Sequence, residues 1–243
     1  MTDTCKYKRV LLKLSGEALM GDSAFGISHD MLTYLAGEIK SITSLGGELG
    51  LVIGAGNIFR GVAGSASGMD RASADNMGML ATVMNCLALQ DVLEQHQIPS
   101  RVLSAIPMET VCEPYSKRRA MEYLTTKQVV IFAAGTGNPY FTTDTAAVLR
   151  GLEIDADVIL KATRVDGVYD KDPLKFDDAV KFEQLNYSEA LQRRLKVMDS
   201  AAISLAMDNN KKIIVFDMNI VGNIKKAVCG NVAGTLLKGD DNE

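Results

Sequence analysis

Two lysines stand where the sequence predicts the ends of buried strands. Lys13 lies inside the apolar run 10–14, and Lys161 directly follows the apolar run 158–160. An unpaired ammonium group is costly to bury, so each lysine must either extend to the surface or meet an anion. Extension to the surface is the simpler interpretation of one such lysine. Because the arrangement occurs twice, we expect two ammonium groups to converge on phosphate.

Two other predicted strands run into the same short pattern, Gly-x-Gly-Asn, at residues 54–57 and 135–138. Ligands of open parallel sheets bind beyond the carboxyl ends of the strands, where glycine lets backbone N–H groups approach an anion. A glycine pair after a strand is also common in a plain tight turn. The duplication favours two anion-binding loops.

The second of these loops continues through Thr142 and Thr143 to Asp144. Either threonine can cap the helix expected to follow, and the N-terminus of a helix favours an anion. Capping alone would be a structural role. It does not account for Asp144, a carboxylate suited to orient the lysines or the water around a metal ion.

These groups fit phosphoryl transfer, which depends on alignment and on cationic stabilisation of a loose transition state. A phosphate acceptor, with a second pKa of about 6, needs no general base. Two unit charges of donor and acceptor at roughly 5 Å repel by about 3 kcal/mol at an effective dielectric of 20. We expect Lys13, Lys161, Arg60 and Mg²⁺ to offset this repulsion.

Composition and missing motifs exclude several other classes. The 243 residues are 47% hydrophobic and carry a formal net charge of −4, which disfavours binding to nucleic acid. The longest apolar run, 129–134, is far too short for a membrane helix, and the first nine residues lack the centre of a signal peptide, so we expect a cytosolic protein. Four scattered cysteines and two histidines predict neither a disulfide framework nor a side-chain metal site. Neither the P-loop nor the dinucleotide fingerprint is present.

Strands and helices alternate along the chain, which predicts an α/β fold with a mostly parallel sheet covered on both faces. Helices are expected over 31–45, after Ser28 as N-cap, and over 73–97, a methionine-rich helix that we expect to combine core packing with a subunit contact. No linker divides the chain, so we expect a single domain over residues 1–243. The expected strands are residues 10–14, 49–53, 101–105, 129–134, 158–160 and 213–216.

Five segments together resemble the bacterial uridylate kinases of the amino acid kinase family. They are residues 13–17, 52–61, 78–85, 135–144 and 161–169. The likeness extends from about Arg9 to Thr235; the first two segments also match carbamate, aspartate and acetylglutamate kinases. It implies a three-layer αβα sandwich and a kinase that transfers the γ-phosphoryl group of ATP to UMP, giving UDP and ADP in pyrimidine nucleotide biosynthesis.

The resemblance also assigns site residues. ATP would contact Lys13, Leu14, Ser15, Gly16, Gly56, Arg60, Thr163, Tyr169 and Asp172. UMP would contact Ala55, Asp75, Thr136, Gly137, Asn138, Pro139, Tyr140, Phe141, Thr142 and Thr143. Lys13, Lys161, Asp144 and Arg60 would form the transfer site, with Mg²⁺ entering with ATP.

Regulation is implied by the resemblance alone. The segment Gly21, Asp22, Ser23, Ala24, Phe25 and Gly26 matches a region for activation by GTP, and family members are typically homohexamers inhibited by UTP. One departure is Ala55, where the family usually has glycine. Alanine is acceptable there if its φ is negative.

Two alternatives remain at this stage. One is another kinase of the family with a carboxylate or carbamate acceptor. The other is a non-catalytic nucleotide-binding sensor or storage protein on the same scaffold.

Overall fold

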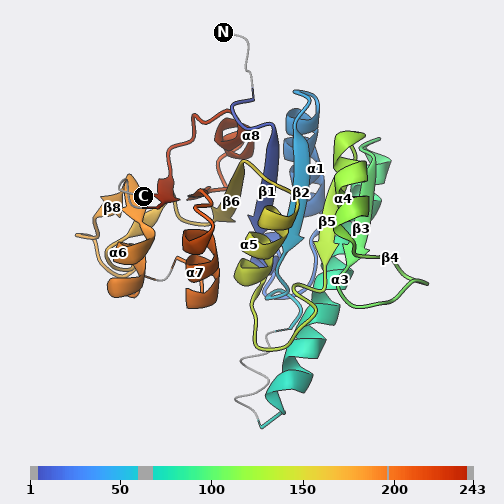
Figure 1. Ribbon diagram of the computed structural model, residues 1–243, viewed down its shortest axis with the longest axis horizontal. Helices are drawn as coiled ribbons and strands as arrows, with labels where there is room; N and C mark the ends of the chain where they lie inside the picture. Colours follow the sequence, from blue (N-terminus) through green and yellow to red (C-terminus); the bar gives the residue numbers. More distant parts are fainter. Residues whose placement is uncertain (1–4, 60–67, 196, 240–243) are drawn as a thin grey trace.

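A computed structural model of the chain describes residues 5–59, 68–195 and 197–239. Within them a nine-stranded sheet has the order β4-β3-β5-β2-β1-β6-β10-β11-β9 (Figure 1). Its neighbouring strands are parallel except for the pair β10 and β11. The strands are β1 (Arg9–Leu14), β2 (Glu48–Ile53), β3 (Ser100–Ser104), β4 (Glu113–Pro114), β5 (Val129–Ala133), β6 (Val158–Thr163), β9 (Gln184–Asn186), β10 (Ile213–Asp217) and β11 (Thr235–Lys238).

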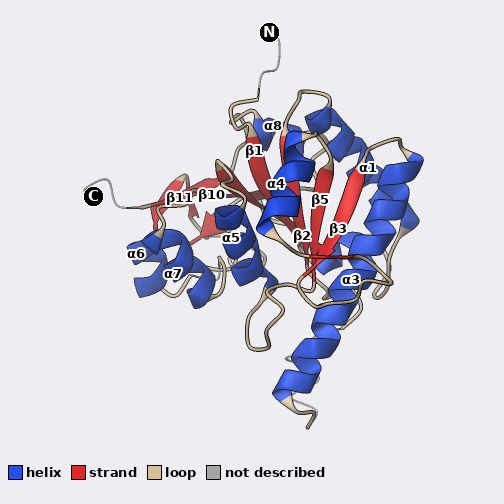
Figure 2. Ribbon diagram, turned by 45° about the vertical axis from the view of Figure 1, so that its right-hand side comes forward, coloured by secondary structure: helices blue, strands red, loops and turns tan. Residues whose placement is uncertain are grey.

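Helices cover both faces of this sheet and make three layers (Figure 2), which confirms the predicted α/β class. One face packs against α1 (His29–Thr43), α3 (Arg71–Gln95) and α8 (Asn223–Val228). The other packs against α4 (Lys117–Thr125), α5 (Thr143–Glu153), α6 (Tyr187–Gln192) and α7 (Ser200–Asp208). A 3-10 turn, η1 (Gly16–Leu19), follows β1, and β7 (Val168–Tyr169) pairs antiparallel with β8 (Lys181–Phe182). In the described ranges, none of the helices combines the length and the apolarity that crossing a membrane requires.

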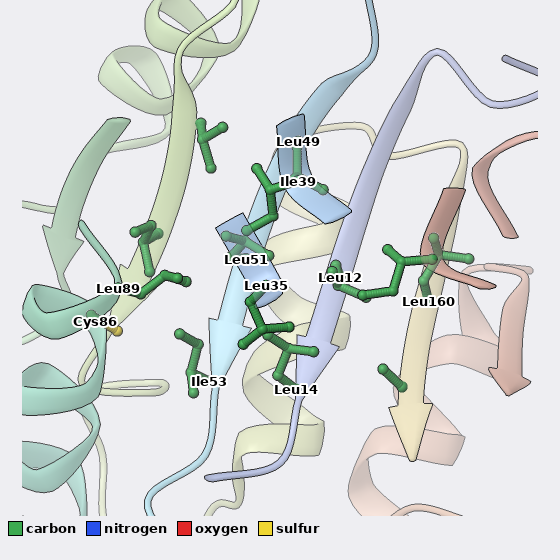
Figure 3. Close-up of a cluster of buried hydrophobic side chains, with 14 of the residues drawn as sticks. Leu12, Leu14, Leu35, Ile39, Leu49, Leu51, Ile53, Cys86, Leu89 and Leu160 are labelled. Carbon is green, nitrogen blue, oxygen red and sulfur yellow. The ribbon is translucent and has the colours of Figure 1, made fainter. Parts of the chain in front are cut away.

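Side-chain alternation decides which face receives the lysines. Leu12 and Leu14 of β1 and Leu160 of β6 belong to the cluster under α1 and α3 (Figure 3). Leu11 and Ile159 belong to the opposite cluster, under α5 and α7. Because successive side chains of a strand point to opposite faces, Lys13 and Lys161 also face α5 and α7.

The predicted elements are present, and their ends differ from the predicted ones by at most three residues. Ser28 caps α1 by accepting a hydrogen bond from Met31 N at 3.4 Å, and Thr142 caps α5 by accepting one from Asp144 N at 3.0 Å. Both caps satisfy donors that the first turn of a helix leaves free. Features that were not predicted include the antiparallel strand β11, which lies between β10 and β9, and the small hairpin of β7 and β8.

The amino ends of the central strands are closed by an ionic cluster. Arg9, at the start of β1, donates from Nε to Glu48 Oε2 at 2.8 Å and from Nη1 to Ile154 O at 2.8 Å. Lys127 adds a contact of 3.0 Å to Glu48 Oε1. Burial opposes ionisation of Glu48, but its hydrogen bonds and ion pairs with Lys127 and Arg9 outweigh burial and hold its pKa below the usual range.

Candidate active site

The centre of the site is an ion pair of two lysines with one carboxylate. Lys13 and Lys161 are direct register partners on the neighbouring strands β1 and β6. Asp144, in the first turn of α5, receives Lys13 Nζ at 2.7 Å on Oδ1 and Lys161 Nζ at 2.8 Å on Oδ2. The two ammonium groups therefore lie at the same carboxyl edge, on the same face of the sheet.

Burial sets the electrostatics of this triad. It would raise the pKa of Asp144, but the charges of Lys13 and Lys161 outweigh it and hold that pKa below the ordinary value. Burial also lowers the pKa of Lys161, against the opposing attraction of Asp144. An anion that approached the lysines would enter an environment in which charge interactions are stronger than in water.

Asp199 holds the helices that carry the site together. It caps α7 by accepting from Ala202 N at 2.9 Å. It also accepts hydrogen bonds from the hydroxyl groups of Thr142 and Thr145 of α5, the latter at 2.9 Å. Lys161 Nζ donates to the carbonyl of Val197 just before α7. Asp199 was not predicted as a site residue, although its place directly before a helix is a typical N-cap signal.

The loops after β1 and β2 pack against each other without space for a side chain. A Cβ at Gly16 would lie 2.5 Å from Asn57 Oδ1 and 2.6 Å from the carbonyl oxygen of Gly54. Gly16 therefore allows the end of β1 to approach the first Gly-x-Gly-Asn loop. Ala55 in that loop does not have a positive φ, so alanine replaces the usual glycine there without left-handed strain.

The second loop contains four left-handed residues, among them Ala134 with φ 59° and Tyr140 with φ 72°. Side chains outside the loop hold this unusual backbone. Ala134 N donates to Thr82 Oγ1 of α3 at 2.9 Å, and Tyr140 N donates to Asp75 Oδ2 at 2.8 Å.

Asp75 therefore lies beside the loop of residues 136–143. The resemblance assigns both Asp75 and this loop to UMP. Arg71 donates to the same carboxylate oxygen at 2.7 Å from the preceding turn of α3. Tyr140 and Phe141 expose their rings at the loop, so the loop offers both polar groups and aromatic surface.

A cavity of about 550 Å³ opens beside Lys161. Thr163, Tyr169 and Asp172, the residues assigned to the nucleoside part of ATP, all line it. Val165, Phe176 and Leu195 add apolar wall, which suits a nucleobase. The cavity therefore connects the residues assigned to the nucleoside with one of the two lysines.

Two further assignments concern Arg60 and the segment 21–26. Arg60 falls outside the described residues. The segment 21–26 forms a turn that joins the first loop through Gly26, whose N–H donates to Asn57 O at 2.9 Å. Among the described residues, side chains do not form a cluster of three or more metal-ligating groups.

Several known proteins are similar to this chain over nearly its whole length. The model of the amino acid kinase family matches residues 8–217. A solved UMP kinase from Bacillus anthracis is 41% identical, with a TM-score of 0.92 over 96% of this chain and 97% of that one. A UMP kinase from Ureaplasma parvum is 35% identical, with a TM-score of 0.90 over 96% and 99%. A uridylate kinase from Archaeoglobus fulgidus is 27% identical, with a TM-score of 0.73 over 94% and 99%.

Proposed function

The chain belongs to the amino acid kinase family, and on this premise we propose that it is a UMP kinase that transfers the γ-phosphoryl group of ATP to UMP. The observation that carries the proposal is the meeting of Lys13 and Lys161 on Asp144, at the carboxyl ends of strands next to those that carry the two glycine loops. The near full-length similarity to UMP kinases identifies the acceptor as a nucleotide rather than a carboxylate or carbamate.

ATP is assigned to the side of β1, β6 and the 550 Å³ cavity. Its nucleoside would contact Thr163, Tyr169 and Asp172. Its phosphates would contact Lys13, Ser15 and Gly16, where the backbone of η1 begins, and would extend to Gly56. Leu14 and Arg60 complete the ATP contacts in this proposal.

UMP is assigned to the loop of residues 136–143, with Ala55 and Asp75. Asp75 already orients that loop through Tyr140 N, and a carboxylate in this place suits a hydrogen bond from a ribose hydroxyl. The phosphate of UMP would then face the N-terminus of α5, whose free N–H groups favour an anion.

The lysines would act on the group in transfer. Each ammonium can exchange its contact with Asp144 for the oxygens of the moving phosphoryl group, whose negative charge spreads in the transition state. Asp144 would keep both ammonium groups aligned between turnovers. The acceptor phosphate is already ionised, so a general base is not needed.

Mg²⁺ fits the site as an ion carried by the phosphates of ATP. Both oxygens of Asp144 face a lysine. A single carboxylate suits Mg²⁺, because this ion usually retains several waters and seldom binds in a cage made only of protein ligands. When bound, the ion would neutralise phosphate charge. Asp144 is the described residue best placed to orient its water shell.

Regulation and assembly extend the proposal. We expect activation by GTP at the turn 21–26, inhibition by UTP, a homohexamer and a cytosolic location. The support for the first is the pair of hydrogen bonds between Gly26 and Asn57 of the phosphate loop. The support for assembly is the exposed apolar surface of α3, formed by Met77, Leu80 and Met84.

A coupled ADP-release assay tests the function. The purified chain is given MgATP with UMP, CMP, dUMP, AMP or GMP, and in separate arms carbamate or an amino acid. We expect rapid ADP release with UMP. GTP should raise the rate of this release, and UTP should lower it. Turnover with carbamate or an amino acid while UMP stays inert, or ATP binding without any turnover, would contradict the proposal.

A further inference from the structure

One helix contacts both glycine loops at their first turns. Thr82 and Asn85 lie three residues apart in α3, and therefore on one face of the helix, and both are buried. Thr82 contacts the loop after β5, and Asn85 contacts the loop after β2. The loop after β5 is assigned to UMP, and the loop after β2 is assigned to both nucleotides, through Ala55 for UMP and Gly56 for the ATP phosphates.

Asn85 joins a closed amide pair. Its Nδ2 donates to Gly54 O at 2.7 Å and to Asn57 Oδ1 at 2.8 Å. Asn57 returns a hydrogen bond from Nδ2 to Asn85 Oδ1 at 2.9 Å and a second to Gly26 O at 2.9 Å. The whole pair is buried, where an unmade hydrogen bond costs more than it does at the surface.

Thr82 forms the matching contact on the other side. Its hydroxyl donates to Met79 O at 2.7 Å, within its own helix, and accepts from Ala134 N at 2.9 Å. Ala134 is the left-handed residue that turns β5 into the second loop. The next residue, Gly135, accepts from Arg150 of α5 at 3.4 Å, so the start of this loop is held from both helices.

We propose that Thr82 and Asn85 are positioning residues that fix the separation of the two glycine loops, with α3 as the rigid spacer. The inference rests on the proposed function, because it concerns how the two phosphates are aligned. Neither residue needs to touch a nucleotide. A rigid helix that holds both loops keeps the reacting groups at transfer distance, and a misplacement of about 1 Å can slow transfer by about 10²-fold.

The inference predicts a particular kinetic pattern. If α3 sets only the spacing, both nucleotides still bind to their contacts when one of the two helix contacts is removed. The kcat value should then fall while the KM values for ATP and UMP change little. A residue that merely supported one loop would instead change the KM of a nucleotide that contacts that loop.

Thr82→Val and Thr82→Ser form the first test. Valine keeps the shape but leaves Ala134 N without its acceptor, whereas serine keeps the hydroxyl. We expect Thr82→Val to lower kcat by at least about tenfold with both KM values within about threefold, and Thr82→Ser to recover most of the loss. Thr125→Val, on the exposed face of α4, removes a comparable hydroxyl contact to Glu122 O and should leave kcat unchanged.

Asn85→Asp is the second test and does not depend on the first variant. The isosteric carboxylate repels Gly54 O when ionised, but when protonated it can donate to that oxygen. We expect its kcat, divided by that of the wild type at the same pH, to rise from pH 8 to pH 6, since burial raises the pKa of a carboxyl group. Asn209→Asp, at the exposed end of α7, should show a ratio near one at both pH values.

The outcomes separate this inference from the function. Unchanged kcat in both variants, equal losses in Thr82→Val and Thr82→Ser, or a change confined to one KM would overturn the positioning role. Faster hydrogen exchange at the Ala134 amide in Thr82→Val supports the contact without any nucleotide, and unchanged exchange speaks against it. A wild type that fails to phosphorylate UMP would refute the proposed function and leave the exchange experiment valid.

Discussion

At the scale of single residues, the site depends on one carboxylate shared by two ammonium groups. The sequence predicted that Lys13, Lys161 and Asp144 act together. Both lysines stand at the carboxyl ends of predicted strands, and Asp144 follows a predicted anion-binding loop. It did not reveal that the lysines are register partners, since the order of strands in a sheet is set by long-range packing. Asp199, Thr82 and Asn85 were missed because a helix cap or a buried polar residue has the same local sequence whether or not it supports a site.

Replacing Lys161 by methionine tests its part in transfer. The substitution keeps the apolar stem but removes the charge, so we expect kcat for UMP phosphorylation to fall about 10²- to 10³-fold, as when a preorganised donor is lost. Steady-state kinetics with both substrates measures the effect. Lys226→Met, on the exposed side of α8, is the matched control, and a fall below tenfold at Lys161 would argue against the assigned role.

Replacing Asp144 by asparagine tests the electrostatics of the triad. The folded-state pKa of Asp144 lies below its unfolded value of about 3.9, so its stabilising effect is complete above that value and lost as the pH falls through the folded pKa. We expect Asp144→Asn to lower the free energy of unfolding by about 3 kcal/mol at pH 7, because two buried lysines lose their counter-ion. The difference from the wild type should narrow below about pH 4. Denaturant titrations between pH 3.5 and 7 measure the difference in the free energy of unfolding between the variant and the wild type. A difference that does not change with pH would contradict the interpretation.

At the scale of elements, the local signals were readable. The six strands and the caps at Ser28 and Thr142 follow from apolar runs and N-cap chemistry, and the structure confirms them. The antiparallel β11 and the hairpin of β7 and β8 were not predicted from the sequence, because short strands form only where a partner strand is available. The close approach of η1 to the first glycine loop also depends on tertiary packing, and Gly16 is the residue that permits it.

Gly16→Ala tests that close approach. The added Cβ would lie 2.6 Å from both Gly54 O and Gly56 N, which are backbone atoms that cannot move without displacing the loop. We expect the free energy of unfolding to fall by about 1–3 kcal/mol and kcat to fall more than tenfold. Gly37→Ala, in the exposed middle of α1 with open space around its Cβ, should instead raise stability by about 0.5–1 kcal/mol. Similar results for the two variants would contradict the packing argument.

Ala55→Gly tests the departure from the usual glycine. Because Ala55 has no left-handed backbone, glycine adds only freedom to the unfolded chain, and we expect stability to fall by about 0.4–1 kcal/mol. The KM for UMP should stay within about twofold of the wild type if the contact is made by the backbone N–H. Thermal unfolding and UMP titrations measure the two effects, and a large gain in UMP affinity would show that the methyl group obstructs the site.

At the scale of the whole molecule, α3 both holds the site and presents apolar surface. Its first turns extend beyond the carboxyl ends of the strands (Figure 1), and Met77, Leu80 and Met84 are 43%, 51% and 55% exposed. The sequence suggested that this methionine-rich helix combines core and subunit contacts, but only the structure separates the two faces. Asn85 and Thr82 lie on the buried face, so a subunit packed on the exposed face would contact the same helix that positions the loops.

Leu80→Glu with Met84→Glu tests assembly through this surface. Two charges on an apolar contact are costly to bury, so we expect the mass measured by light scattering to fall from that of the wild-type oligomer. Val221→Glu, which adds one charge at another exposed apolar position, should leave the mass unchanged. A wild-type mass equal to that of one chain would refute the proposed hexamer.

The ionic cluster around Arg9 and Glu48 closes the end of the sheet that is remote from the nucleotide loops. The chain enters β1 through this cluster, and the parallel central strands all run away from it. If the enzyme is coupled to a solid support through the segment before β1, the carboxyl edge of the sheet, which carries the catalytic residues, is therefore exposed to the solution. The same polarity recommends the amino-terminal side for affinity tags or fusion partners.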